Sequence, residues 1–296
     1  MNQYPENSPF NPADESAYLH WRSNKLANHP VVFEELLVSI DNPFAISDQE
    51  KQQLLDKIKQ CNMAIYQIKP LEKHAEDKGF LDELGKQFGL NHLDNNLYAD
   101  EDAISSLKVT AEKAGKGYIP YTNRPIAWHT DGYYNTGQTQ VRAMLLHCVQ
   151  PAADGGSNQL LDHEMAYLML RDKNPAYIEA LSRPDAMSIP ANIQDGKVIR
   201  DAVTGPVFSV DSDDNLHMRY TARTRSIEWL DDPLVLEAKD ALLEILKTPS
   251  PYHFEGKLEA GQGLICNNVL HTRTPFEENS NRLLYRARYF DRISND

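Results

Sequence analysis

Three residues of the chain have the types and spacing to hold a metal ion. His129 and Asp131 lie in the run Ile126-Ala-Trp-His-Thr-Asp-Gly132, and His271 follows far downstream. Side chains two residues apart on a strand point to the same face, so His129 and Asp131 could bind one ion together. Two imidazoles and one carboxylate leave coordination positions open, which is typical of non-haem Fe(II) sites that activate O₂. Because the chain has 10 histidines and 43 acidic residues, a chance pair at a strand end is the alternative.

A second feature is a set of arginines that follows His271. Arg282, Arg286 and Arg288 are spaced by even numbers of residues, so a strand would place them on one face. That face could be a solvent-exposed charged stripe. Nearby acids that could pair with such a stripe are Glu277, Glu278 and Asp291. It could instead be a pocket for a carboxylate, which guanidinium binds bidentately, and the nearness of His271 favours the pocket.

The elements that would position these residues are short. Ser47-Asp-Gln-Glu50 is a capping box, which predicts a helix to about Gln60. Further helices are predicted at Glu76–Phe88, His163–Arg171, Pro175–Leu181 and Pro233–Leu246. Strands are predicted at Met63–Ile68, Trp128–Asp131, Arg142–Val149, Asn158–Leu161, Ala186–Ile189, Val207–Val210, His217–Tyr220, Tyr252–Phe254, Gly263–Cys266 and Leu283–Phe290. Many short strands with helices in long connections favour a mainly β structure with helices (α+β), namely a sandwich or jelly roll with helical insertions.

The domain organisation is predicted from composition. Residues 1–45 are polar and interrupted by prolines, and we expect them to form an amino-terminal extension that wraps the main body, a partly disordered tail being the alternative. Residues 46–296 would then form a single jelly-roll domain. Lys108–Asn123 and Asp195–Pro206 contain glycine and lie between stronger elements, so both are predicted lids over a site.

Charge and cysteine content limit the classes of partner. At a net charge of −13, the chain lacks the basic character that nucleic acids and anionic membranes require. Its three cysteines are widely separated and suggest no disulfide framework, which favours a reducing cytoplasm. The polar start does not resemble a signal peptide, and no apolar run approaches the ~20 residues that cross a bilayer. We therefore expect a cytoplasmic protein with a small-molecule substrate and with no nucleic-acid or membrane partner, and a homo-oligomer is left open.

Several runs of the chain together resemble one enzyme family. They are His129-Thr-Asp131, Leu146-His-Cys148, Gly155-Gly156, His271-Thr-Arg273 and the pair Arg282 and Arg286. Their types, order and spacing over about residues 109–292 resemble the TauD/TfdA-type Fe(II)/2-oxoglutarate-dependent dioxygenases. Tyr121-Thr122 and Leu145-Leu-His-Cys148 look most like the γ-butyrobetaine hydroxylase-like branch. The chain departs from that branch at Gly132, where the branch has an aromatic residue, and it lacks the branch's cysteine-rich zinc module.

The resemblance implies a double-stranded β-helix and a set of roles. His129, Asp131 and His271 would ligate Fe(II) as the catalytic centre. Arg286 would pair with the C5 carboxylate of 2-oxoglutarate, and Arg282 would lie near its C1 carboxylate. Asn158 stands where the family often has a threonine that contacts the C5 carboxylate. With 2-oxoglutarate and O₂ as cosubstrates, the family hydroxylates a substrate and releases succinate and CO₂.

The substrate is predicted only as a class. Tyr121, Tyr133, Tyr134 and Arg273 are the candidate substrate contacts. The tyrosines could cage a quaternary ammonium, or they could be core packing. We expect hydroxylation of a small polar metabolite: a betaine, an amino acid, a sulfonate or a carboxylate. The alternative is a cupin-like metal-dependent hydrolase or isomerase that uses the same His/Asp/His site without 2-oxoglutarate.

Overall fold

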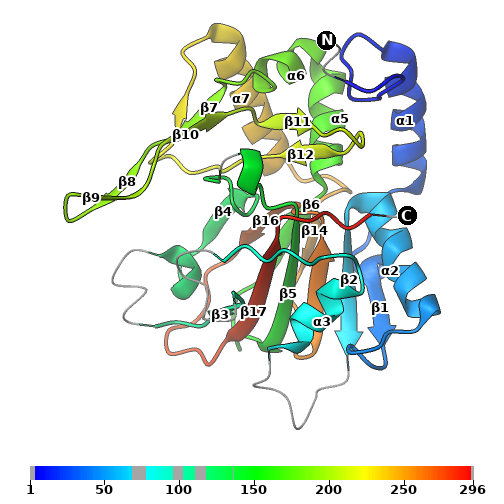
Figure 1. Ribbon diagram of the computed structural model, residues 1–296, viewed down its shortest axis with the longest axis vertical. Helices are drawn as coiled ribbons and strands as arrows, with labels where there is room; N and C mark the ends of the chain where they lie inside the picture. Colours follow the sequence, from blue (N-terminus) through cyan, green and yellow to red (C-terminus); the bar gives the residue numbers. More distant parts are fainter. Residues whose placement is uncertain (1–3, 69–77, 96–102, 111–117, 136, 295–296) are drawn as a thin grey trace. The chain divides into compact units, whose positions relative to one another are not determined.

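A computed structural model describes residues 4–68, 78–95, 103–110, 118–135 and 137–294 (Figure 1). The chain forms two compact units. The first comprises Met1–His29, Trp128–Gln140 and Leu161–Tyr252, and the second comprises Pro30–Ala127, Val141–Leu160 and His253–Asp296.

The second unit is built on a six-stranded sheet of order β1-β2-β15-β5-β17-β3. Its strands are β1 (Leu37–Ile40), β2 (Met63–Ile68), β3 (Ser105–Leu107), β5 (Ala143–Gln150), β15 (Gln262–Cys266) and β17 (Leu283–Tyr289). Only the β1–β2 pairing is parallel among the pairings of this sheet. A four-stranded sheet has the order β14-β6-β16-β4. Its strands are β4 (Ile126–His129), β6 (Asn158–Leu161), β14 (Phe254–Gly256) and β16 (Leu270–Arg273).

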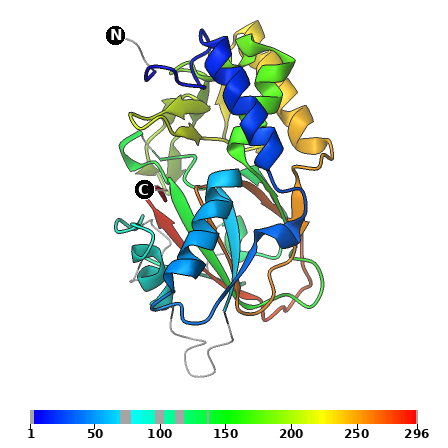
Figure 2. The same ribbon diagram turned by 90° about the vertical axis from the view of Figure 1, so that its right-hand side faces the viewer.

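Alternation along the strands of the large sheet creates two apolar layers. One face carries Tyr66, Leu145 and Ala287, which pack with residues of α2 (Asp48–Cys61) and α3 (Phe80–Lys86). The opposite face carries residues such as Leu146 and Leu284, which pack with Leu160 and Phe254 of the smaller sheet. Figure 2 shows α2 lying across the strands β1 and β2. The helices and the smaller sheet therefore cover opposite faces of the large sheet.

The first unit is mainly helical. Its helices are α1 (Glu15–Asn28), α5 (His163–Lys173), α6 (Pro175–Leu181) and α7 (Pro233–Lys247). Short strands accompany them: β7 (Met187–Ile189), β8 (Asn192–Gln194), β9 (Lys197–Arg200), β10 (Val203–Gly205), β11 (Phe208–Val210), β12 (Leu216–Met218) and β13 (Glu228–Trp229). A buried ion cluster joins α1 to the start of α5, since Lys25 Nζ lies 2.6 Å from both Asp162 Oδ2 and Glu164 Oε2.

The predicted mixture of many short strands with helices is confirmed. The predicted capping box is present, because Ser47 Oγ accepts from the Glu50 N–H and the Glu50 carboxylate accepts from the Ser47 N–H. The amino-terminal segment contains the helix α1, which the sequence patterns did not indicate. The domain boundary at residue 45 stays a prediction.

One local prediction needs correction. Strand β4 ends at His129, and Asp131 lies in the following turn, because Gly132 adopts a φ of 65° that a continuing strand excludes. The predicted lid Asp195–Pro206 spans β9 and β10, and its role as a lid stays a prediction. Of the other predicted lid, residues 111–117 lie outside the described residues, as do residues 76–77 of the predicted second helix. Among the described residues, no helix combines the length and apolar character needed to cross a membrane.

Candidate functional site

His129 and Asp131 are held by backbone pairing at the end of β4. His129 forms an antiparallel bridge with Thr221, and the Thr130 N–H donates to the carbonyl of Tyr220 at 3.0 Å. The Tyr220 N–H in turn donates to Thr130 Oγ1 at 3.1 Å, and Thr130 is fully buried. The positive φ of Gly132 then turns the chain. The two candidate ligands are therefore fixed on either side of a buried threonine.

The structure brings His129, Asp131 and His271 together, and their role as metal ligands stays a prediction. One ligand atom from each residue lies within 4.8 Å of those of the other two, and His129 Nε2 is 3.7 Å from Asp131 Oδ1. Strand β16, which carries His271, neighbours β4 in the smaller sheet. Within the described part of the chain, no other three His, Cys, Asp or Glu residues form such a group.

The tautomer of His271 fits metal binding. Its Nδ1 lies 3.0 Å from the carbonyl oxygen of Val269. Because a carbonyl oxygen only accepts, Nδ1 must carry the proton, and Nε2 keeps its lone pair. A hydrogen bond of this kind orients the ring and makes the ligating nitrogen more basic. The donor set of two imidazoles and a carboxylate therefore suits an Fe(II) ion with open coordination positions.

The predicted cosubstrate arginines lie in the second unit, on or beside β17. Arg286 is paired with Leu146 of β5 and has the same strand parity as Leu284, so it faces the layer that lies between the two sheets. Arg282 is buried, and its guanidinium lies 5.2 Å from the ring centre of Phe276. Burial lowers the pKa of Arg282 to about 10, because the charged form loses hydration in the interior.

The acids that could have paired with these arginines are engaged elsewhere. Glu277 accepts from the N–H groups of Ala153 and Asp154 and from the Ser280 hydroxyl, and these bonds lower the pKa of its carboxyl to about 2. Asp291 accepts from the backbone N–H of His92 and lies 2.8 Å from its ring.

Arg288 has a different role, because it pairs with the buried Asp94 at 2.5 Å. Because Arg282 and Arg288 are buried, the structure does not show a solvent-exposed charged stripe paired with Glu277, Glu278 or Asp291 at these two arginines.

A small pocket in the second unit joins several of these positions. Its lining includes His271, Asn158, Leu146 and Leu264 together with Phe33. The Asn158 amide donates to the carbonyl of Thr272 at 2.7 Å. This pocket places a candidate metal ligand and a candidate cosubstrate contact around one space.

Two candidate substrate residues, Tyr121 and Arg273, make contacts that indicate a structural role. Tyr121 is only 3% exposed and belongs to the apolar layer between the sheets. Arg273 donates to the carbonyls of Ile119, Pro120, Thr122 and Arg124. Burial, with the nearby charges of Arg282 and Arg286, lowers the pKa of Arg273 to about 9. These contacts make Arg273 a support for residues 119–124.

The other two tyrosines lie beside a candidate ligand. The ring of Tyr133 meets that of His129 edge-on at 6.5 Å, and the rings of Tyr133 and Tyr134 are 5.2 Å apart. Arg223 Nη1 donates to the Tyr133 hydroxyl at 3.0 Å, and the Arg200 guanidinium lies 5.7 Å from the centre of the Tyr134 ring. The sequence analysis missed Arg200 and Arg223, because neither belongs to a motif or a periodic pattern.

Arg219 fixes the backbone around these tyrosines. Its guanidinium donates to five carbonyl oxygens, those of Tyr133, Met187, Val203, Gly205 and Pro206. Burial lowers its pKa to about 10. Arg219 thus joins the turn after Asp131 to β7 and to the segment around β10.

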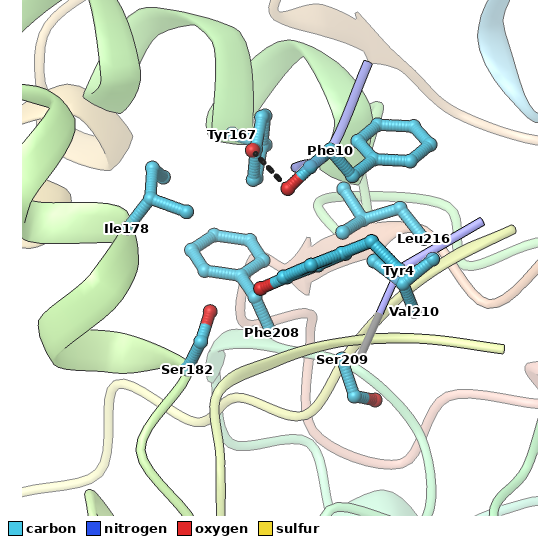
Figure 3. A pocket seen from close by; sticks show the side chains of 9 residues that line it. All are labelled: Tyr4, Phe10, Tyr167, Ile178, Ser182, Phe208, Ser209, Val210 and Leu216. Carbon is cyan, nitrogen blue, oxygen red and sulfur yellow. Dashed lines mark hydrogen bonds between the residues drawn. The ribbon is translucent and has the colours of Figure 1, made fainter. Parts of the chain in front are cut away.

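A separate cavity in the first unit contains none of the predicted site residues (Figure 3). Aromatic and aliphatic side chains such as Tyr4, Phe208 and Ile178 surround it, and the Tyr167 hydroxyl donates to the Phe10 carbonyl at 3.2 Å. Its polar lining consists of hydroxyl groups without a charged residue. The cavity offers no group that would activate a substrate.

A family match agrees with the His/Asp/His group. Residues 23–288 match the family described as "Taurine catabolism dioxygenase TauD, TfdA family". The chain therefore belongs to the TauD/TfdA family of dioxygenases, and the predicted enzyme class agrees with that family.

Individual relatives agree with this assignment. The chain is 32% identical over 169 residues to a uridine-5'-phosphate dioxygenase of Amycolatopsis sp, a match that covers 55% of this chain and 60% of that protein. It is 30% identical over 192 residues to a uridine-5'-phosphate dioxygenase of Streptomyces sp, covering 63% of this chain and 68% of the relative. The non-haem iron oxygenase OrfP, solved in complex with Fe and α-ketoglutaric acid, has a TM-score of 0.55 at 16% identity and covers 82% of this chain and 80% of its own. That likeness supports the fold.

Proposed function

We propose that this protein is an Fe(II)- and 2-oxoglutarate-dependent dioxygenase that oxidises a nucleoside 5'-phosphate. The observation that carries the reaction class is the approach of His129, Asp131 and His271 to within 4.8 Å of one another, in a chain of the TauD/TfdA family. These three side chains would hold the iron. When bound, iron and 2-oxoglutarate supply the activation of O₂ that drives oxidation of a C–H bond, with release of succinate and CO₂.

The binding residues for 2-oxoglutarate are proposed from the second unit. Arg286 would pair with the C5 carboxylate, and Asn158 would line the same pocket with its amide. Arg282 would lie near the C1 carboxylate. The buried charge of Arg282 supports this role, because a desolvated guanidinium gains from an anionic partner.

The substrate class is proposed from two relatives and from the charges near Tyr133 and Tyr134. Both curated relatives are named as uridine-5'-phosphate dioxygenases. Arg223 and Arg200 already place cations beside the two tyrosines, which disfavours an aromatic cage for a second cation and hence a betaine. We therefore propose a nucleoside 5'-phosphate as the substrate in preference to an amino acid, a sulfonate or a carboxylate. We do not assign the chain to the γ-butyrobetaine hydroxylase-like branch.

The arrangement of the two sheets can also be interpreted in terms of the predicted fold. We propose that the two sheets of the second unit, which pack face to face, are the two halves of a double-stranded β-helix. The triad residues carried by β4 and β16, with the turn after β4, would then lie at one end of the smaller sheet.

The test uses the anaerobic protein loaded with Fe(II) and 2-oxoglutarate. A visible charge-transfer band is expected in the wild type, because 2-oxoglutarate chelates an ion with open positions. His129→Ala should lose the band, whereas His20→Ala, which changes an exposed histidine of α1, should keep it. Adding O₂ and uridine 5'-phosphate should release succinate. Absence of the band in the wild type would contradict the reaction class, and a band without substrate-dependent succinate would contradict only the substrate class.

A further inference from the structure

Tyr133 and Tyr134, the aromatic pair beside His129, lie among charged side chains of the first unit. Tyr133 follows Asp131 by two residues, after the turn at Gly132, and its ring meets the ring of His129 edge-on. Tyr134 packs against Tyr133 at an interplanar angle of 81°. Both tyrosines are partly exposed. A substrate that reached His129 would therefore meet these two rings.

Two guanidinium groups flank the pair, each from a different segment. Arg223 follows the Thr221 bridge to His129 and donates to the Tyr133 hydroxyl. Arg200 ends β9 and lies over Tyr134, while its Nη1 and Nη2 atoms donate to the carbonyls of Asp201 and Pro190 at 2.7 Å each. Over the described ranges of the chain, neither guanidinium forms an ion pair with a carboxylate within 4.0 Å.

The contrast with Arg219 separates a binding role from a structural one. Arg219 is 5% exposed and directs its donors at five backbone carbonyls, so it has no capacity for a ligand. Arg223 is exposed and has one intramolecular hydrogen bond. Arg200 is partly buried, and burial lowers its pKa, so its charge has lost hydration that an anion would replace.

We propose that Arg200 and Arg223 form the subsite for the anionic end of the substrate, a phosphate monoester held beside Tyr133 and Tyr134. Guanidinium binds phosphate through paired, charge-assisted hydrogen bonds, and two such groups match the charge of a phosphate dianion. Tyr134 would pack against the organic part of the substrate, and Tyr133 would hold Arg223 in position through its hydroxyl. This inference rests on the proposed function, and it names the residues that select a phosphorylated substrate over an uncharged one.

The experiment is anaerobic calorimetry on the protein loaded with Fe(II) and 2-oxoglutarate. Uridine 5'-phosphate, uridine and inorganic phosphate are titrated into the wild type, Arg200→Gln, Arg223→Gln and the double variant. Each single variant should weaken binding of uridine 5'-phosphate by roughly tenfold to a hundredfold, as expected when a hydrogen bond to a charged group is lost. Binding of uridine should change less than threefold or so, because the nucleoside lacks the phosphate.

Matched controls remove a positive charge close by. The control variants are Lys197→Gln and Arg225→Gln. Lys197 lies on β9 with Arg200, Arg225 lies two residues from Arg223, and both side chains are exposed. These variants should bind uridine 5'-phosphate as the wild type does. A Tyr133→Phe variant should show part of the loss seen in Arg223→Gln and should keep its uridine affinity.

The outcomes separate the subsite from the substrate class. Tight binding of uridine 5'-phosphate by both arginine variants would overturn the subsite and leave the proposed function standing. Equal losses in the control variants would also overturn it, since the effect would then be general electrostatic attraction. If the wild type forms the charge-transfer complex but binds no nucleoside phosphate, the substrate class and the subsite both fail.

Discussion

At the scale of single residues, His271 and the segment between His129 and Asp131 are oriented by contacts with the backbone. The Val269 carbonyl selects the His271 tautomer, and the Tyr220 carbonyl holds the Thr130 N–H between the other two ligands. The arginines of the site differ in their hydrogen-bond and ion-pair partners. Arg219 and Arg273 donate to carbonyls, whereas Arg282 forms no ion pair with a carboxylate among the residues that the structure describes. Arg219 and Arg273 therefore support the backbone of the site, and we propose anionic partners for Arg282, Arg200 and Arg223.

Arg286→Ala tests the proposed contact with the C5 carboxylate. Loss of a charge-assisted hydrogen bond should raise the KM for 2-oxoglutarate by about 10- to 150-fold, with a smaller change in kcat. Steady-state succinate formation measures both constants. Arg225→Gln, an exposed arginine in the other unit, serves as the control and should leave this KM unchanged. An unaltered KM in the Arg286 variant would assign the carboxylate to another residue.

His147 predicts a pH dependence of stability. It is 6% exposed, packs edge-on against Phe80 at 4.7 Å, and burial lowers its pKa to about 4. Because the unfolded chain binds the proton more readily, this contribution to stability is complete above about pH 6.5 and decreases as the pH falls toward 4. Between pH 7 and pH 5 the loss should be about 2 kcal/mol. Urea unfolding of the wild type should show this extra loss relative to His147→Gln, and parallel curves would contradict it.

At the scale of elements, one glycine permits the packing at the centre of the large sheet. Gly263 of β15 is paired with Tyr66 of β2 and His147 of β5. The Tyr66 ring occupies the space above it and stacks on the His147 ring, with 5.9 Å between centres. A Cβ at Gly263 would lie 2.1 Å from Tyr66 Cζ. Any side chain at this position would therefore require the Tyr66 ring to move.

Gly263→Ala should destabilise the protein by about 2 kcal/mol or more, because the alanine would overpack a buried ring. Gly137→Ala is the matched control, since a Cβ at Gly137 would have no neighbour within 4 Å. Chemical unfolding measures both. Similar stabilities for the two variants would show that the Tyr66 ring moves aside at little cost.

At the scale of the whole molecule, ligand binding should stabilise the native state. An ion and 2-oxoglutarate that bind only the folded chain would add about 2.7 kcal/mol at 100 times their dissociation constant. Mn²⁺ with 2-oxoglutarate should therefore raise the Tm of the wild type and of His20→Ala by several degrees, as measured by calorimetry. His271→Ala should show no such rise. A rise of equal size in that variant would place the metal elsewhere.

The sequence predicted the triad and most elements because their signals are local or motif-based. The helix at Asp48–Cys61 follows from its capping box, and the strand Leu283–Tyr289 follows from alternation. Asp131 in a turn was missed because the strand was expected to continue through Asp131, whereas Gly132 adopts a positive φ and the strand ends at His129. Arg200 and Arg223 were missed because their proposed role depends on their proximity in space to Tyr133 and Tyr134. That proximity cannot be predicted from spacing along the chain.

The hydrogen bonds of Arg219 have a consequence for substitutions at neighbouring positions. All of its hydrogen bonds go to main-chain oxygens, at Tyr133 and at four positions from Met187 to Pro206. Every amino acid carries that oxygen, so Arg219 is indifferent to which side chains occupy these five positions. Substitutions at these five positions that keep the backbone conformation should therefore leave the hydrogen bonds of Arg219 intact.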